Sequence, residues 1–193
     1  MGTRSVIDPE LLLRIRDNLP GGTWESITTA ELAEAGGLSR MTLHRRGITK
    51  DELLAQFGAR LEAEYRDALF DALTAPGTAR ERLRHALLGV CEVNERYLPL
   101  LDALGARMDA VFHEPAAPGQ AVLTRPVFAG ALRRLLEDGR HDGSMAVADP
   151  EETATLVFNA VVHTYRHMRA GHRWAAPRAR ERVVALVLNG LPA

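Results

Sequence analysis

Apolar residues recur every three to four positions along most of the chain, a spacing that places them on one face of an α-helix. Capping residues and breakers divide this pattern into segments. The predicted helices cover about residues 9–19, 28–35, 40–46, 49–73, 79–96, 98–112, 125–136, 149–169 and 177–191. A turn over 137–143 is expected to end the helix over 125–136. No convincing alternation of the kind found in strands appears, so the sequence predicts an all-α fold.

The segment that begins at Thr28 is predicted to hold two short helices with a tight turn between them, followed by the start of a longer helix. Thr28 and Glu31 have the spacing of a capping box, in which each side chain satisfies a backbone N–H of the other residue. Gly36 and Gly37 end the first helix, because glycine adopts the left-handed conformation that commonly follows a helix. Ser39 is placed to cap the second helix. This order of elements is typical of a helix-turn-helix.

The second helix of this motif carries three arginines and a histidine. Arginine can bind guanine edges in a DNA groove with two hydrogen bonds, or it can neutralise phosphate. The alternative is a solvated basic helix end without a partner, but the capped helix and the glycine turn before it favour DNA binding. The candidate DNA-binding residues are Thr28, Thr29, Ser39, Arg40, Met41, Thr42, His44, Arg45, Arg46 and Lys50.

This stretch resembles the DNA-binding domain of the tetracycline-repressor (TetR) family of bacterial regulators. The matching positions keep the family's spacing and are Thr28 or Thr29, Leu32, Ala33, Gly37, Leu38, Ser39, Thr42, Leu43, Thr49, Lys50, Leu53 and Leu54. The chain departs from the family at His44, Arg46 and Gly47, where aromatic residues are usual. The resemblance implies that Lys50 contacts DNA phosphate.

The resemblance also implies two domains. Residues 1–56 would form the helix-turn-helix DNA-binding domain, and residues 57–193 a helical ligand-sensing and dimerisation domain. The implied function is a ligand-responsive transcriptional regulator, most simply a repressor that binds a palindromic DNA operator as a homodimer and is released by a small molecule. The resemblance does not name that effector.

Apolar residues on the last two predicted helices cover more than one narrow stripe. They are Leu156, Val157, Ala160, Val161, Thr164 and Met168 on the first helix, and Val183, Val184, Leu186, Val187, Leu188 and Leu191 on the second. Members of the resembling family commonly pack these helices against a second copy as a four-helix bundle, and the pattern is compatible with such a homodimer. The alternative is that both faces are buried inside one large monomer core.

Composition restricts the partners and the location. The formal net charge is −1, so any DNA contact must be a local basic patch. A single cysteine, Cys91, excludes an internal disulfide. The sequence does not open with a charged and then apolar leader, and its longest aliphatic run, 183–188, is far shorter than the roughly 20 residues that span a bilayer. We therefore expect a cytoplasmic protein without membrane contact.

A sensor domain needs an apolar cavity with a few polar groups. The candidates, of which we expect a minority to line a pocket, are Cys91, Asn94, Tyr97, Met108, Phe112, Phe128, His163, Tyr165, His167 and Trp174. The spacing of His163 and His167 can bind a transition metal, but no third ligand is fixed beside them. We predict no metal and no cofactor.

An enzymatic function finds little support. The sequence has no Gly-x-Ser-x-Gly elbow, no phosphate-binding glycine loop and no His-Glu-x-x-His motif, and Cys91 has no indicated base. The rival to a regulator is a helical small-molecule or protein-interaction dimer whose helix-turn-helix has decayed, as the missing aromatic residues at 44, 46 and 47 suggest. Salt-dependent binding to palindromic DNA distinguishes these hypotheses.

Overall fold

A computed structural model describes residues 7–108, 112–113 and 124–191, except the side chains of Ala106 and Met108. Within these ranges the secondary structure is helical without a strand, which confirms the predicted all-α fold. None of the helices in this part of the chain combines the length and the apolar character that a membrane span needs. The chain divides into two compact units.

Unit 1 comprises Met1–Leu61 and Pro99–Met108, and unit 2 comprises Glu62–Leu98 and Asp109–Ala193. The long helix α4 (Lys50–Thr74) contributes residues to both units. The division therefore falls within a continuous helix and not in a loop.

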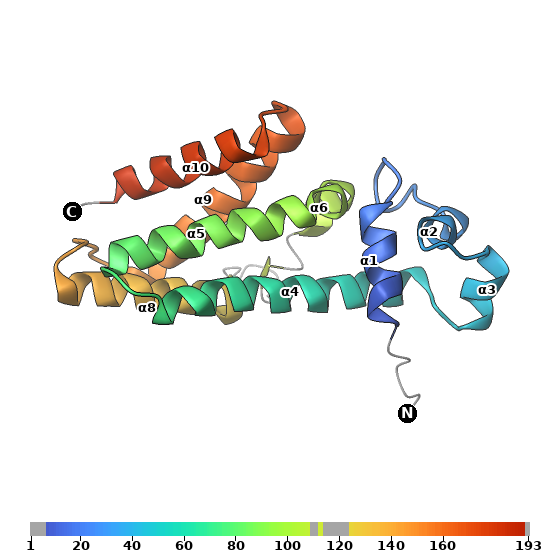
Figure 1. The fold of residues 1–193 in the computed structure, drawn as a ribbon, viewed down its shortest axis with the longest axis horizontal. Coiled ribbons are helices and arrows are strands. Elements are labelled where there is room, and N and C mark those ends of the chain that lie inside the picture. The colour runs from blue at the N-terminus through green and yellow to red at the C-terminus, as the bar shows by residue number, and fades with distance from the viewer. Residues whose placement is uncertain (1–6, 109–111, 114–123, 192–193) are drawn as a thin grey trace, which may run out of the picture. The chain divides into compact units, whose positions relative to one another are not determined.

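Unit 1 is built around three short helices. α2 (Thr29–Ala35) packs against both α1 (Pro9–Asp17) and α3 (Arg40–Arg45), and the first part of α4 follows them (Figure 1). The core includes apolar side chains of these helices that are at most 1% exposed, among them Leu11, Ile15, Leu32, Ala33, Leu43, Leu53 and Phe57. Each helix thus buries one apolar face, as the spacing predicts.

A later segment also belongs to unit 1. α6 (Leu98–Leu104) continues into a 3-10 turn (Gly105–Met108), and nearly all of this segment packs within the unit. The Trp24 backbone N–H donates to Ala103 O over 2.8 Å. The buried Trp24 ring meets the Phe57 ring edge-on, with 6.4 Å between centroids. This tryptophan links segments that are far apart in the sequence.

Unit 2 is a helical bundle built around α5 (Ala79–Arg96). α5 contacts α8 (Pro126–Asp142), α9 (Pro150–Arg166) and α10 (Ala176–Gly190) (Figure 1). α9 in turn packs against α8 and α10, so each of these helices packs against at least two others.

The second half of α4 runs antiparallel to α5. Arg96 Nε bonds Glu64 Oε2 over 2.9 Å near one end of the pair. Farther along, a Cβ added to Gly89 would lie 3.1 Å from the Ala68 Cβ. The two small residues therefore allow the helices to approach closely.

Side-chain caps begin two helices of unit 2, α5 and α9. At the start of α5, the Thr78 N–H donates to Glu81 Oε2 (2.8 Å) and the Glu81 N–H donates to Thr78 Oγ1 (3.3 Å). The bonds that the Thr78 N–H and hydroxyl donate to the Glu81 carboxylate lower the pKa of that carboxyl. Asp149 begins α9 by accepting from two successive backbone N–H groups over 2.9 and 3.0 Å. Local sequence signals thus place both helix starts.

The predicted turn over 137–143 is wrong, because α8 continues through it to Asp142. Gly139, one of the residues that suggested the turn, lies inside the helix, where an added Cβ would come 3.1 Å from the Met145 Cβ. This glycine serves a close contact and does not end the helix. The end comes at Gly143, whose φ of 74° is the left-handed conformation that favours glycine.

Two other predicted helix ends differ from the structure. The helix predicted over 98–112 leaves the α-helical geometry at Gly105, which has a φ of 51°. α9 ends at Arg166 and is followed by a π-helical turn, His167–Gly171. A Cβ on Gly171 would lie 3.1 Å from the His167 ring. Glycine at this position therefore leaves room for the ring to pack against the turn.

We expect Gly130→Ala and Gly139→Ala to change stability in opposite directions. Both glycines lie inside α8, but a Cβ at Gly130 meets nothing within 4 Å. Alanine's higher helix propensity should therefore raise the free energy of unfolding by about 0.5–1 kcal/mol there. At Gly139 the clash of the added methyl group with Met145 should outweigh this gain and lower the free energy of unfolding by about 1–2 kcal/mol. Urea denaturation of both variants checks this, and a gain in both would contradict it.

Candidate nucleic-acid interface and effector site

The helix-turn-helix begins with a complete capping box at α2. The Thr28 N–H donates to Glu31 Oε2 (2.7 Å) and the Glu31 N–H donates to Thr28 Oγ1 (3.2 Å), as the spacing predicts. The bonds that the Thr28 N–H and hydroxyl donate to the Glu31 carboxylate lower the pKa of that carboxyl. At the other end of α2, a Cβ on Gly36 would lie 2.6 Å from Leu11 Cδ1, so glycine lets α2 approach α1. Both ends of α2 are therefore fixed.

One cap and one buried residue hold α3 in place. Ser39 Oγ accepts from the Thr42 N–H over 3.1 Å and lies 2.9 Å from Thr42 Oγ1. Leu43 is fully buried, and Gly47, with a φ of 68°, follows the end of the helix. The hydroxyl groups of Ser39 and Thr42 are thus part of the helix start.

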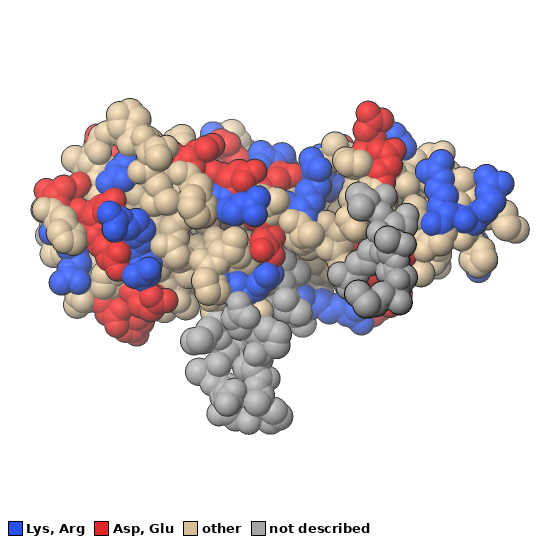
Figure 2. All heavy atoms as spheres, turned by 90° about the horizontal axis from the view of Figure 1, so that it is seen from below, with Lys and Arg blue, Asp and Glu red and all other residues tan. Residues whose placement is uncertain are grey.

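The other side chains on and directly after α3 are exposed. They are Arg40, Met41, His44, Arg45 and Arg46. Figure 2 shows Lys and Arg side chains (blue) gathered over the part of unit 1 that carries α3. Met41 is 74% exposed, although methionine is apolar. These side chains can bind phosphate, guanine edges and the thymine methyl group, which are the groups that DNA presents to a helix in its major groove.

Lys50 is engaged within unit 1. Its ammonium group donates to Ile27 O over 2.6 Å and to Glu25 O over 3.3 Å, and it lies 5.4 Å from the centroid of the Trp24 ring. An ammonium has three N–H donors, so these two bonds leave one donor for a phosphate. The same lysine holds the loop before α2 against the start of α4.

The two threonines at α2 differ in their roles. Thr28 Oγ1 donates to Glu31 Oε2 over 2.7 Å as well as accepting the capping bond, so this hydroxyl serves the helix start. Thr29 is half-buried at the first helical position. The exposed side chains that are able to bind DNA are therefore concentrated on α3.

Four aromatic rings from different segments meet inside unit 2. Tyr65 of α4 meets Phe112, Phe128 of α8 and Phe158 of α9 edge-on, with 5.6, 5.7 and 5.9 Å between centroids. Phe128 and Phe158 stack at 5.1 Å. All four side chains are fully buried. Burial raises the pKa of the Tyr65 hydroxyl well above its usual value, so this group is neutral.

α5 contributes further buried polar groups. Burial raises the pKa of the Cys91 thiol to about 12, so the thiolate does not form at neutral pH. Asn94 Nδ2 donates to Val90 O over 2.9 Å, within its own helix. The Tyr97 hydroxyl donates to Glu64 Oε1 over 2.7 Å.

A carboxylate-centred network joins α5 to the π-helical turn. Glu95 accepts from Arg169 Nε (2.7 Å) and Nη2 (2.6 Å) and from the Tyr165 hydroxyl (2.7 Å). Arg169 also donates to Trp174 O. The hydrogen bonds from Arg169 lower the pKa of Glu95, whereas burial and the Glu95 carboxylate raise the pKa of Tyr165. The network thus fixes the irregular turn after α9.

The structure separates the sequence-predicted pocket candidates into a buried and a peripheral group. The buried residues are Cys91, Asn94, Tyr97, Phe112, Phe128 and Tyr165. His163 is half-buried, and His167 is exposed with its ring 4.9 Å from the His172 ring. Trp174 is half-buried beneath the Arg178 guanidinium, 4.2 Å from the ring centroid. The side chain of Met108 lies outside the described residues.

Sequence reasoning missed Tyr65 and Phe158 as candidates for the sensor interior. Both stand at the helical spacing of ordinary core residues, and no local signal sets them apart. Their meeting in one cluster depends on the packing of α4 against α9. Within the described part of the chain, no group of three or more His, Cys, Asp or Glu is arranged to hold a metal ion.

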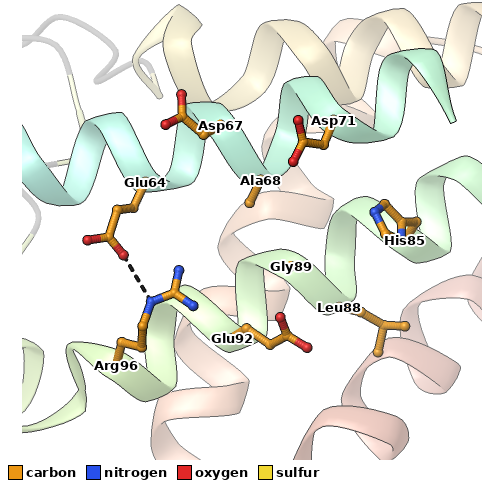
Figure 3. Close-up of a pocket in the computed structure, with 9 residues that line it drawn as sticks. All are labelled: Glu64, Asp67, Ala68, Asp71, His85, Leu88, Gly89, Glu92 and Arg96. Carbon is orange, nitrogen blue, oxygen red and sulfur yellow. Dashed lines mark hydrogen bonds and ion pairs between the residues drawn. The ribbon is translucent and has the colours of Figure 1, made fainter.

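An open groove of about 530 Å³ lies between α4 and α5 (Figure 3). Its lining residues are Glu64, Asp67, Ala68, Asp71, His85, Leu88, Gly89, Glu92 and Arg96. Several of the charges are paired: Arg96 bonds Glu64, and Glu92 Oε1 lies 2.8 Å from Arg180 Nη1. These pairs neutralise much of the acidic character of the groove.

Comparison with solved structures finds similarity over nearly the whole chain. The TetR-family regulator PfmR from Thermus thermophilus aligns over 96% of this chain and 100% of its own, with a TM-score of 0.68 and 20% identity. The fatty acid degradation regulator FadR from Bacillus halodurans aligns over 96% and 98%, with a TM-score of 0.71 and 11% identity. A TetR/AcrR-family regulator from Thermobifida fusca aligns over 93% and 95%, with a TM-score of 0.63 and 19% identity. No family model and no curated protein matches the sequence.

These observations define an all-helical protein that combines a helix-turn-helix with a helical bundle. Its fold is that of the TetR-family transcriptional regulators, as the residue spacing after Thr28 predicts. At identities of 11% to 20%, this similarity is one of fold.

The contact between Glu95 and Arg169 should stabilise the protein at neutral pH and lose its effect in acid. The folded-state pKa of Glu95 lies below the ordinary value of 4.5, so its contribution is present above that value and is lost as the pH falls through the folded-state pKa. We expect Glu95→Gln to lower the free energy of unfolding by about 1 kcal/mol at pH 7, a figure reduced for solvent screening.

Urea denaturation of wild type and Glu95→Gln at pH 7 and at about pH 3.5 measures this difference. The control is Glu181→Gln, which breaks the exposed pair with Arg84 and should have little effect at either pH. A deficit of Glu95→Gln that stays constant with pH would contradict the assigned role.

Proposed function

We propose that the chain is a TetR-family transcriptional regulator that binds double-stranded DNA as a homodimer and responds to a small-molecule effector. The observation that carries this proposal is the exposed, arginine-rich α3 of a capped helix-turn-helix. Its simplest form is a cytoplasmic repressor that an effector releases from a palindromic operator. Residues 1–56 act as the DNA-binding domain, and residues 57–193 as the sensing and dimerisation domain.

Intact helix starts favour a working DNA-binding unit over a decayed one. α4 begins with a further reciprocal pair, in which the Thr49 N–H donates to Glu52 Oε2 (2.9 Å) and the Glu52 N–H donates to Thr49 Oγ1 (3.1 Å). Leu43 remains fully buried although Gly47 stands where the family has an aromatic residue. The helix is therefore anchored without that ring.

The exposed residues of α3 divide by chemistry. Arg40 and Arg45 bind guanine edges or phosphate, and Met41 offers apolar contact to a thymine methyl group. His44 and Arg46 add contacts to the DNA backbone. Lys50 contributes its remaining N–H donor to a phosphate.

The effector acts through the geometry of a dimer. Two recognition helices must enter successive major grooves about 34–36 Å apart. An effector that binds more tightly to a dimer with another spacing lowers operator affinity, because it shifts the population toward that state. α4 is suited to transmit the change, since it is one continuous helix that contributes to both units.

An apolar groove on unit 2 supports the homodimer. It has a volume of about 570 Å³, and its lining includes Val147, Leu156, Ala160, Leu186, Val187 and Leu191. Leu156 on α9 and Leu186 on α10 are 62% and 69% exposed. Contiguous exposed apolar surface of this kind marks interaction sites, and a second copy can present the same groove around a two-fold axis.

We expect Arg40→Ala and Arg45→Ala to weaken operator binding by about 1–3 kcal/mol each, if the side chain contacts a base. Selection of random duplexes with wild-type protein should first yield an inverted repeat whose affinity falls as salt rises. Affinities of the variants for that repeat are then measured by fluorescence anisotropy.

The matched control for these variants is Arg140→Ala, which removes an exposed arginine of α8 in unit 2. It should leave operator affinity and its salt dependence unchanged. Unchanged affinity in both α3 variants would show that this helix does not recognise the operator. The absence of any selected sequence at low salt would favour the alternative of a helical dimer whose helix-turn-helix has decayed.

We expect Leu156→Glu and Leu186→Glu to dissociate the dimer, because a charge buried in an apolar interface loses its hydration. Sedimentation equilibrium should show wild type as a dimer and both variants as folded monomers. Phe70→Glu is the control, since Phe70 of α4 is 53% exposed but does not line the groove. A wild-type monomer, or equal dissociation by Phe70→Glu, would refute this interface.

A further inference from the structure

Among the described residues of unit 2, two side chains that are themselves completely buried each keep a polar atom without a hydrogen-bond partner. These atoms are the hydroxyl oxygen of Tyr65 and Oδ1 of Asn94, and both residues are 0% exposed. An unpaired polar group in the interior costs free energy, and most buried polar atoms in proteins are paired. Ordinary core packing therefore does not account for these two side chains.

The two side chains occupy neighbouring segments of α4 and α5. Glu64, next to Tyr65, accepts from Tyr97, which lies one helical turn after Asn94. On the other side of Asn94 along α5, a Cβ added to Gly89 would lie 3.1 Å from the Ala68 Cβ of α4. These contacts bracket Asn94 on α5 and Tyr65 on α4, so the two residues lie at the same level of the helix pair.

Their surroundings are apolar and uncharged. The Tyr65 ring is packed against three phenylalanine rings. Apart from tyrosine and cysteine, the buried polar or charged side chains among the described residues are Asn94 and Thr124, and neither carries a charge. An ionised ligand group placed here would lose its hydration without a buried counter-ion. A neutral ligand avoids this cost.

We propose that Tyr65 and Asn94 form the polar end of the effector site, and that the effector is a neutral, largely apolar molecule with a hydroxyl or N–H group, an assignment that rests on the proposed sensor function. Asn94 Oδ1 can only accept, whereas the Tyr65 hydroxyl can donate or accept. One ligand hydroxyl therefore satisfies both atoms. The rings touch in this structure, so the ligand binds by displacing part of the cluster and replaces ring contacts with its own apolar surface.

Three probes of similar shape separate the ligand classes. 2-Naphthol carries the neutral hydroxyl, 2-methylnaphthalene lacks a hydrogen-bonding group, and 2-naphthoate carries a charge. Calorimetric titration of full-length wild type should give saturable binding of 2-naphthol, with a dissociation constant lower by at least about fivefold than for the other two. Equal binding of 2-naphthoate, or no binding of 2-naphthol, would overturn the proposal.

Two tyrosine variants test the site itself. Tyr65→Phe removes the unpaired hydroxyl, so the ligand-free protein should melt about 2–4 °C higher than wild type and should lose the preference for 2-naphthol. The matched control is Tyr97→Phe, which removes a buried hydroxyl that is paired with Glu64 over 2.7 Å. It should melt lower and keep the preference. A lower melting temperature for Tyr65→Phe would show that its hydroxyl is satisfied and would refute the assignment.

Asn94→Leu is a second variant of the site, because leucine has the branched shape of asparagine but no hydrogen-bonding group. It should also reduce the preference for 2-naphthol, independently of any change in Tyr65. DNA selection is measured separately, so the two proposals can fail separately. A selected inverted repeat without a preference for 2-naphthol refutes the effector class alone, whereas Tyr65-dependent binding without DNA binding refutes the regulator and leaves the ligand site.

Discussion

The packing of four aromatic rings is the constraint on which unit 2 depends. Tyr65, Phe112, Phe128 and Phe158 come from α4, from the segment before Thr124, from α8 and from α9, and each ring contacts the other three. Such pairs contribute about 0.5–1.5 kcal/mol each beyond the burial of their surface. Exposed ion pairs on the same helices contribute less, because water and salt screen them. The rings therefore determine how the helices meet, and the charges at the surface adapt to that packing.

The helix-turn-helix could be predicted from the sequence because its signals are local. Thr28 and Glu31 bond across three residues, Ser39 bonds Thr42 across the same interval, and Gly37 and Gly47 adopt positive φ directly after helices. Each of these interactions is complete within one helical turn. Knowledge of the rest of the fold is not needed to anticipate them, and the similarity to TetR-family structures agrees with the pattern they form.

Other features could not be predicted because they depend on contacts between distant residues. Gly139 lies inside α8 because Met145, beyond the end of that helix, packs closely against it. In the sequence alone, a glycine at this position is equally consistent with a turn. Lys50 matches the family's spacing, but its bonds to Ile27 O and Glu25 O require the loop before α2 to fold back toward α4. Tyr65 differs from any core residue only in that its hydroxyl lacks a partner, which is a property of the packed interior.

Only one residue of α3, Leu43, is buried. The positions around it that face outward contribute little to folding, since surface substitutions away from caps and cores usually change stability by less than about 0.5 kcal/mol. Under the proposed function, DNA recognition and folding are therefore separable along this helix. Mutations at Arg40, Met41 or Arg45 can then accumulate during evolution without unfolding the protein, so descendants of one gene can acquire new binding sequences while the bundle and its interior stay the same.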